Sequence, residues 1–150
     1  MMSNSQEGDK QPQCSAGTFG AYRNIPEDSL PYIEGFLAPV PSDKKEEYLE
    51  FNRKAAPLFK DIGVARMVEC WGDDLMRGKH TDFYKAVDAK EGETVVFSWM
   101  EYPDKAARDA AYAKMDNDPR FEALGAMPMD GKRMIFSGFQ PIFDTDGKLA

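Results

Sequence analysis

The chain has 150 residues, 42% of them hydrophobic and 30% charged, and can therefore form a core of its own. Its 26 acidic and 19 basic residues give a formal net charge of -7, which argues against nucleic acid or an anionic membrane surface as a partner, since both need a basic face. No stretch approaches the roughly 18 to 20 apolar residues of a membrane-spanning helix.

The first 29 residues differ in composition from the rest of the chain. Ser, Gln, Asn, Gly and Pro predominate there, and the apolar residues Phe19, Tyr22 and Ile25 follow no sustained period. Such a segment cannot bury enough apolar area to offset the entropy lost on ordering. We therefore expect residues 1–29 to form a disordered or loosely docked tail. The alternative is that these three side chains pack on the surface of the domain. Residues 30–150 are expected to form one domain.

The cellular location follows from the cysteines and from the N-terminal residues. The chain has two cysteines, Cys14 and Cys70, whereas a small secreted domain usually carries a larger, even-numbered disulfide framework. The first residues show neither a basic region followed by an apolar one nor the Arg-rich composition of a mitochondrial presequence. These features favour a cytoplasmic protein.

The first part of the domain predicts a strand, a helix and a second strand. Residues 32–40 form the first strand, and Ser42 stands where the N-cap of a helix is expected. Apolar residues then recur every three or four positions, as on one buried helical stripe: Tyr48, Phe51, Ala55, Leu58 and Ile62. Pro57 should kink or split this helix, and Gly63 is a natural stop. Residues 64–71 form the second strand.

The second part of the domain predicts a hairpin, two helices and a final strand. Residues 83–89 and 94–102 form the hairpin, after a polar loop. Asp104 caps the next helix, a short helix begins at Pro119, and residues 133–143 form the last strand.

This order of elements is typical of a ferredoxin-like, split βαβ α+β sandwich, with an antiparallel sheet of four or five strands and both helices on one face. A doubly wound parallel sheet is disfavoured because two of the connections lack helices. Both alternations of the strands are apolar, so the sheet face without helices would be a large apolar patch in water. We therefore expect a homodimer that pairs through this face.

Two glutamates stand out because each alternates with apolar residues on one face of its strand. Glu34 lies between Tyr32 and Phe36 in this alternation, and Glu69 has equally apolar neighbours. One interpretation is a pocket carboxylate with a raised pKa that acts as an acid or base. The other is a glutamate paired with Lys or Arg, since structural ion pairs are common at such positions.

The loop before residue 83 holds the single histidine, His80, whose side chain has a pKa near neutrality. His80 could relay protons, or could join Asp73, Asp74 and Asp82 around a divalent ion; the alternative is a solvated turn. The sequence has no Gly-x-Gly-x-x-Gly, Cys-x-x-Cys or His-x-x-x-His pattern. No metal centre and no cofactor are therefore expected.

Several motifs along the domain resemble those of one known family. They are Tyr32-Ile33-Glu34-Gly35-Phe36, Gly72-Asp73-Asp74, Tyr102-Pro103, Asp118-Pro119-Arg120 and Met127-Pro128-Met129-Asp130-Gly131. Through these motifs the chain is similar to the YbaA-like bacterial proteins, a domain-of-unknown-function family (number 1428) in the dimeric α/β-barrel superfamily. The resemblance implies a ferredoxin-like protomer whose sheet faces that of a second copy. It implies no particular reaction.

The functional expectation is a small organic molecule bound in the barrel pocket, with the reaction unknown. Tyr32, Trp71 and Trp99 are the candidate apolar lining of that pocket. In the first alternative the protein is a cofactor-free acid–base enzyme, oxygenase-like or isomerase-like, that uses Glu34 or Glu69 as the base. In the second alternative side chains fill the barrel and the protein is a non-catalytic structural dimer.

Overall fold

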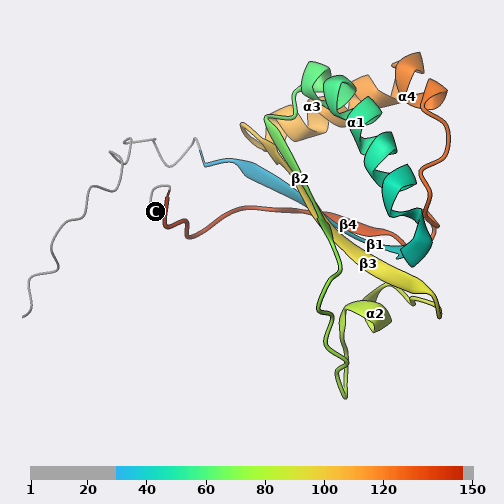
Figure 1. The fold of residues 1–150 in the computed structure, drawn as a ribbon. Coiled ribbons are helices and arrows are strands. Elements are labelled where there is room, and N and C mark those ends of the chain that lie inside the picture. Colours follow the sequence, from blue (N-terminus) through green and yellow to red (C-terminus); the bar gives the residue numbers. More distant parts are fainter. Residues whose placement is uncertain (1–29, 147–150) are drawn as a thin grey trace, which may run out of the picture.

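The computed structural model describes residues 30–146, and its strands form one antiparallel sheet in the order β2-β3-β1-β4 (Figure 1). The strands are β1 (Tyr32–Pro41), β2 (Arg66–Trp71), β3 (Glu93–Tyr102) and β4 (Ile135–Phe139). The helices are η2 (Ser42–Lys44), α1 (Lys45–Ile62), α2 (Phe83–Ala86), α3 (Lys105–Asp116) and α4 (Pro119–Ala123). The ferredoxin-like α+β fold predicted from the sequence is confirmed, with four strands in the described residues. The tail expected over residues 1–29 lies outside the described residues.

The two long helices, α1 and α3, lie side by side on one face of the sheet, and α4 continues from α3 (Figure 1). The strand register decides which side chains face them. Glu34 pairs with Met100 across β1 and β3, and Glu69 pairs with Ser98 across β2 and β3. Because paired residues share a face, these four side chains all lie on the side that the helices cover.

Helix α1 differs from its prediction at its start and in its middle. Ser42 is not the N-cap, because it lies within the 3-10 turn η2 and makes no capping hydrogen bond. Pro57 does not split the helix, which continues to Ile62. Pro57 is exposed, so water can bind the carbonyl that its missing N–H leaves free. Gly63 ends the helix as predicted, with a φ of 119° that favours glycine.

The predicted strand over residues 83–89 is wrong, because these residues contain the short helix α2. The side chain of Asp82 accepts a hydrogen bond from the backbone N–H of Lys85 and so caps this helix. The aromatic residues at its start had favoured a strand, but local capping outweighs their weak strand propensity. Among residues 30–146, no helix is both long and apolar enough to cross a membrane.

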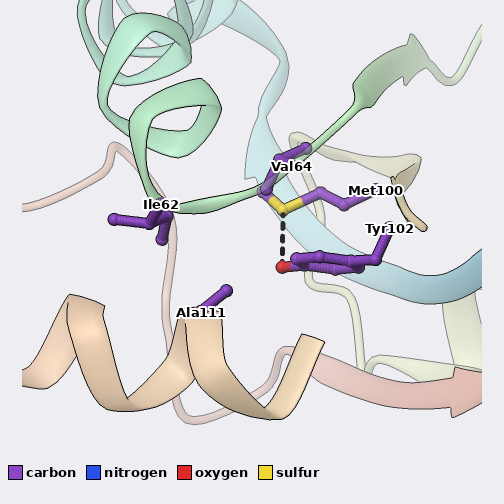
Figure 2. Close-up of a cluster of buried hydrophobic side chains, with 5 residues drawn as sticks. All are labelled: Ile62, Val64, Met100, Tyr102 and Ala111. Atoms are coloured by element: carbon purple, nitrogen blue, oxygen red, sulfur yellow. Dashed lines mark hydrogen bonds between the residues drawn. The ribbon is translucent and has the colours of Figure 1, made fainter. Parts of the chain in front are cut away.

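The core consists of two groups of buried side chains between the sheet and the helices. One group joins the end of α1 to β3 and α3, and its buried members are Ile62, Val64, Met100, Tyr102 and Ala111 (Figure 2). The other joins β1 and β3 to the start of α1, and its buried members are Ala38, Val40, Tyr48 and Val96. The region between the two groups is where the helices and the sheet leave space.

Candidate functional site

A cavity of about 230 Å³ lies between the helix-covered face of the sheet and the helices α1 and α3. Its wall is mainly apolar and is formed by side chains of all four strands, both long helices and the connection between α4 and β4. Ala38 and Val96 line it from the sheet, and Ala111 lines it from α3. The small side chain of Ala111 is one reason why the cavity stays open, because a larger residue there would point into it.

Methionines line much of this cavity. They are Met100 on β3, Met115 on α3, and Met127, Met129 and Met134 in the connection that precedes β4. Methionine is flexible and polarizable, and it makes favourable contacts with aromatic rings. This part of the wall can therefore adapt to ligands of different outline.

The polar part of the wall is centred on Glu69 of β2. Its carboxylate accepts a hydrogen bond of 2.5 Å from the hydroxyl of Tyr48 and another from the side chain of Ser98. Burial raises the pKa of the Glu69 carboxyl, and the two hydrogen bonds oppose this rise only in part. Burial and the neighbouring Glu69 charge raise the pKa of Tyr48, so its hydroxyl keeps its proton and donates. A carboxylate with a raised pKa thus faces a mainly apolar cavity.

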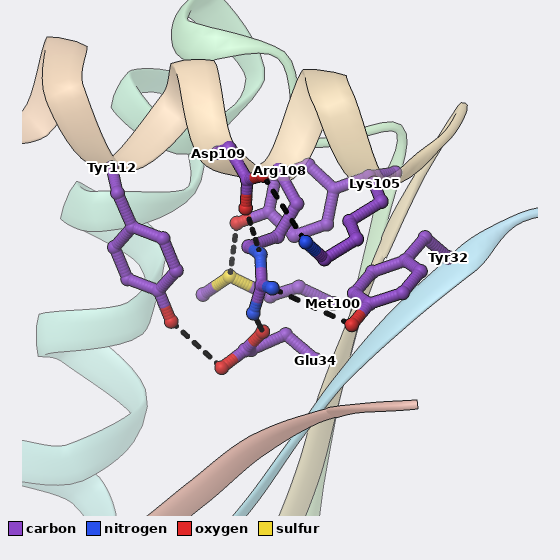
Figure 3. A network of polar contacts seen from close by, with 8 residues as sticks. Tyr32, Glu34, Met100, Lys105, Arg108, Asp109 and Tyr112 are labelled. Atoms are coloured by element: carbon purple, nitrogen blue, oxygen red, sulfur yellow. Dashed lines mark hydrogen bonds and ion pairs between the residues drawn. The ribbon is translucent and has the colours of Figure 1, made fainter. Parts of the chain in front are cut away.

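Glu34 lies in a second polar group, which ties β1 to α3 (Figure 3). Its side chain is 1% exposed. One carboxylate oxygen is 2.6 Å from Nη1 of Arg108, and the other accepts a hydrogen bond of 2.7 Å from the hydroxyl of Tyr112. Both oxygens are therefore engaged. The guanidinium of Arg108 also lies 4.9 Å from the ring centre of Tyr32.

This arrangement favours the structural interpretation of Glu34, as the buried partner of the partly buried Arg108. Glu34 reaches the cavity only indirectly, through Tyr112, which lines the wall and donates to it. Burial and the bond to Glu34 raise the pKa of the Tyr112 hydroxyl. Of the two candidate bases, Glu69 is the one whose carboxylate lies in the cavity wall.

His80 and the three neighbouring aspartates do not form a metal site. His80 is exposed in the connection between β2 and α2, away from the cavity wall. Asp82 caps α2 and also accepts a hydrogen bond of 3.0 Å from the N–H of Gly78. Within residues 30–146, no three His, Cys, Asp or Glu side chains are placed to hold a metal ion, so Asp73, Asp74, His80 and Asp82 are not brought together as a ligand set. The solvated-turn interpretation fits this loop.

The three candidate lining residues have separate positions. Tyr32 packs on Arg108, at the start of the inner strand β1. Trp71 lies behind the cavity wall, with its ring centre 6.0 Å from that of Tyr48. Trp99 is on the opposite face of the sheet, beside Phe97, so it does not line this cavity and lies on the face where the barrel pocket was expected. Alternation along a strand shows that neighbours point to opposite sides, but not which side the helices cover.

Sequence reasoning missed the groups that bind the two glutamates. Tyr48 and Asn52 are one helical turn apart on the buried face of α1, where the Asn52 amide donates to the Tyr48 carbonyl. Arg108 and Tyr112 are likewise one turn apart on α3. One sequence signal could have pointed to these groups. On each helix, a tyrosine and a second polar residue stand one turn apart on the face toward the sheet. The partner glutamates, however, are distant in sequence.

The chain is similar in sequence to a family and to proteins whose descriptions name no reaction. Residues 31–131 match the family described as "Protein of unknown function (DUF1428)". The Uncharacterized protein YbaA of Escherichia coli K12 is 56% identical over 116 residues, which cover 77% of this chain and 99% of that protein. YbaA of Shigella flexneri matches to the same extent.

Solved structures align with this chain at low sequence identity. An uncharacterized NIPSNAP domain protein from Burkholderia xenovorans aligns with a TM-score of 0.50 and 18% identity, over 73% of this chain and 93% of that protein. A dimeric ferredoxin-like protein from an uncultured marine organism aligns with a TM-score of 0.42 and 17% identity, over 73% of this chain and 92% of that one. The similarity to the NIPSNAP domain protein shows a common fold and no common activity.

Proposed function

The chain belongs to the DUF1428 family, and we propose that it is a homodimeric protein that binds a small, uncharged organic molecule in the cavity beneath α1 and α3. The observation that carries the proposal is the cavity itself, an apolar space of about 230 Å³ with the Tyr48–Glu69 pair in its wall. Sites for small molecules are commonly apolar concavities with a few convergent polar groups. This site lies within one protomer, beneath its helices, whereas the sequence analysis expected a pocket in the barrel between two sheets.

The chemistry of the wall limits the ligand. An anion is disfavoured because it would face the Glu69 carboxylate in an apolar surrounding. A neutral hydroxyl or N–H group is favoured, since a carboxylate offers about four acceptor positions and the hydrogen bonds from Tyr48 and Ser98 occupy two of them. The volume is smaller than the range of about 300 to 1,000 Å³ typical of drug-sized ligands, which favours a molecule of one or two rings.

The homodimer is supported by the sheet face that α1 and α3 leave uncovered. Phe97 of β3 and Ile135 and Phe139 of β4 are exposed there, on the two strands that flank β1. A monomer would keep these apolar side chains in water, and a two-fold mate that presents the same face would bury them. Each dimer would then hold two cavities, one in each protomer. The domain boundary near residue 30 and the cytoplasmic location remain predictions.

A second candidate function is acid–base catalysis in the same cavity. The raised pKa of Glu69 supports it, because a general base is most effective when its pKa approaches the working pH. Glu69 would take a proton from the bound molecule, and the Tyr48 hydroxyl would hold the carboxylate in place. His80, proposed from the sequence as a relay, lies outside the cavity wall and has no part in this scheme.

NMR of the methionine methyl groups tests the ligand proposal. The full-length protein, labelled with ¹³C in its methionine methyls, would be titrated with phenol and with indole, which are uncharged and carry one hydrogen-bond donor each. The signals of Met100, Met115 and Met129 should shift with saturation, because these residues line the cavity. Met76, which is 76% exposed, serves as the control and should not shift. Equal shifts at Met76 and Met100, or none at any of the cavity methionines with either probe, would contradict the proposal.

A further inference from the structure

The segment that follows β4 exposes two large apolar side chains. Residues 140–146 leave the end of β4 and extend away from the body of the domain (Figure 1). Within this segment Ile142 is 83% exposed and Phe143 is 69% exposed. Two adjacent residues of this size in water are unfavourable, because removing large apolar side chains from water is favourable. An apolar surface that accepts them is therefore expected.

The uncovered face of the sheet offers such a surface. A groove of about 540 Å³ runs along β1 and β4, and its lining includes Leu37, Ile135 and Phe139. Phe97 of β3 closes it on the other side. Gly35 lies in its floor, where the absence of a side chain leaves room beside the ring of Phe139.

The segment cannot reach the groove of its own chain without a sharp reversal. Phe139 is the last residue of β4, and it pairs with Ile33, near the start of β1. The groove extends back from this point toward Ile135, whereas residues 140–146 continue in the opposite direction (Figure 1). The occupant of the groove must therefore come from another molecule.

A second copy of the chain supplies that occupant. In a two-fold dimer the contact is reciprocal, so when the arm of one copy enters the groove of its partner, the partner's arm enters the groove of the first copy. We propose that residues 140–146 form an exchanged arm, in which Ile142 and Phe143 of each copy enter the groove of its partner. This inference rests on the proposed homodimer and adds to it the segment that holds the two copies together.

Sedimentation of the full-length protein tests the arm separately from the dimer. The double variant Ile142→Ser, Phe143→Ser should weaken dimerisation at least ten-fold relative to the wild type. Met76→Ser is the matched control, since it removes an equally exposed apolar side chain outside the arm, and it should leave the dimer unchanged. A double variant that dimerises as tightly as the wild type would overturn the arm but not the dimer. A monomeric wild type would overturn both and leave the cavity proposal in place.

Mixed dimers give the direct readout. In dimers of one ¹³C-labelled and one unlabelled copy, isotope-filtered NOEs should connect the Ile142 methyls of one copy to Leu37 and Phe97 of the other. NOEs from Ile142 that arise only within one copy, or none to the groove, would overturn the exchange even if the dimer forms.

Discussion

The hydroxyl of Tyr48 lies 2.5 Å from Oε2 of Glu69 and joins helix α1 to strand β2 across the wall of the cavity. The contact gives a desolvated carboxylate a donor that keeps its proton, because the pKa of Tyr48 is itself raised. Within the lining of the cavity Glu69 supplies the carboxylate, and its raised pKa makes it the candidate acid–base group there.

The raised pKa of Glu69 predicts a specific pH dependence of folding stability. Because the folded protein binds this proton more tightly than the unfolded chain, the contribution of Glu69 is fully present below its ordinary value of 4.5. It is lost as the pH rises through the higher, folded-state pKa. Glu69→Gln should remove this loss. The free energy of unfolding of the variant, relative to that of the wild type, should therefore increase from pH 4 to pH 8. Urea unfolding across this range measures the difference.

The exposed Glu46 provides the control for this experiment. Glu46→Gln should show no comparable trend. A difference between Glu69→Gln and the wild type that stays constant with pH, or that changes in the opposite direction, would show that the Glu69 pKa is not raised.

The ion pair of the buried Glu34 and the partly buried Arg108 should dominate the electrostatic contribution to stability. Arg108→Met leaves the Glu34 carboxylate buried without its cation, and loss of one partner of a buried pair typically costs about 3 to 5 kcal/mol. Lys54→Met, which removes an exposed partner of Glu50, should cost less than about 1 kcal/mol. Equilibrium unfolding in urea compares the two variants.

A second variant separates the missing cation from the lost packing of Arg108. Glu34→Gln combined with Arg108→Met should recover part of the stability, since no buried charge then lacks a partner. If the double variant is as unstable as the sum of the two single variants, the pair is not coupled as the structure indicates.

The sequence could predict the positions of the two glutamates but not their partners. Alternation along β1 and β2 places Glu34 and Glu69 on faces with apolar neighbours, and the register confirms that they share a face. Arg108 lies 74 residues from Glu34, and only the packing of α3 on the sheet joins them. That Trp99 and the two glutamates lie on opposite faces of the sheet relative to the helices was not predictable for the same reason, because burial of a face depends on where the helices pack. The short helix α2 was missed since a single capping aspartate, Asp82, decides it.

The connection between α4 and β4, which carries part of the cavity wall, is held by Arg133. Its guanidinium binds both carboxylate oxygens of Glu93, at 2.6 and 2.9 Å, and lies 3.0 Å from Asp130. Arg133→Gln should therefore speed amide hydrogen exchange in residues 127–131, by releasing this segment from β3. Arg120→Gln, which removes an exposed arginine beside Asp118 and Asp61, should leave exchange there unchanged.

The stability that the Arg133–Glu93 contact contributes depends on pH. The Arg133 hydrogen bonds lower the pKa of Glu93, so the stability that this carboxylate contributes is present above its ordinary value of 4.5. It is lost as the pH falls through the lower, folded-state pKa. In the wild type, exchange in residues 127–131 should therefore accelerate only in acid. Equal exchange rates for Arg133→Gln and the wild type at neutral pH would contradict this role of the arginine.

Native mass spectrometry of the freshly purified, full-length protein tests the central claim that the cavity holds a small molecule. We expect a dimer that carries a bound molecule in its protomers. Ala111→Leu, which places a larger side chain in the cavity wall, should lose that molecule, whereas Ala110→Leu on the exposed side of α3 should retain it. Bare protein masses for the wild type, or a molecule retained equally by both variants, would contradict the claim.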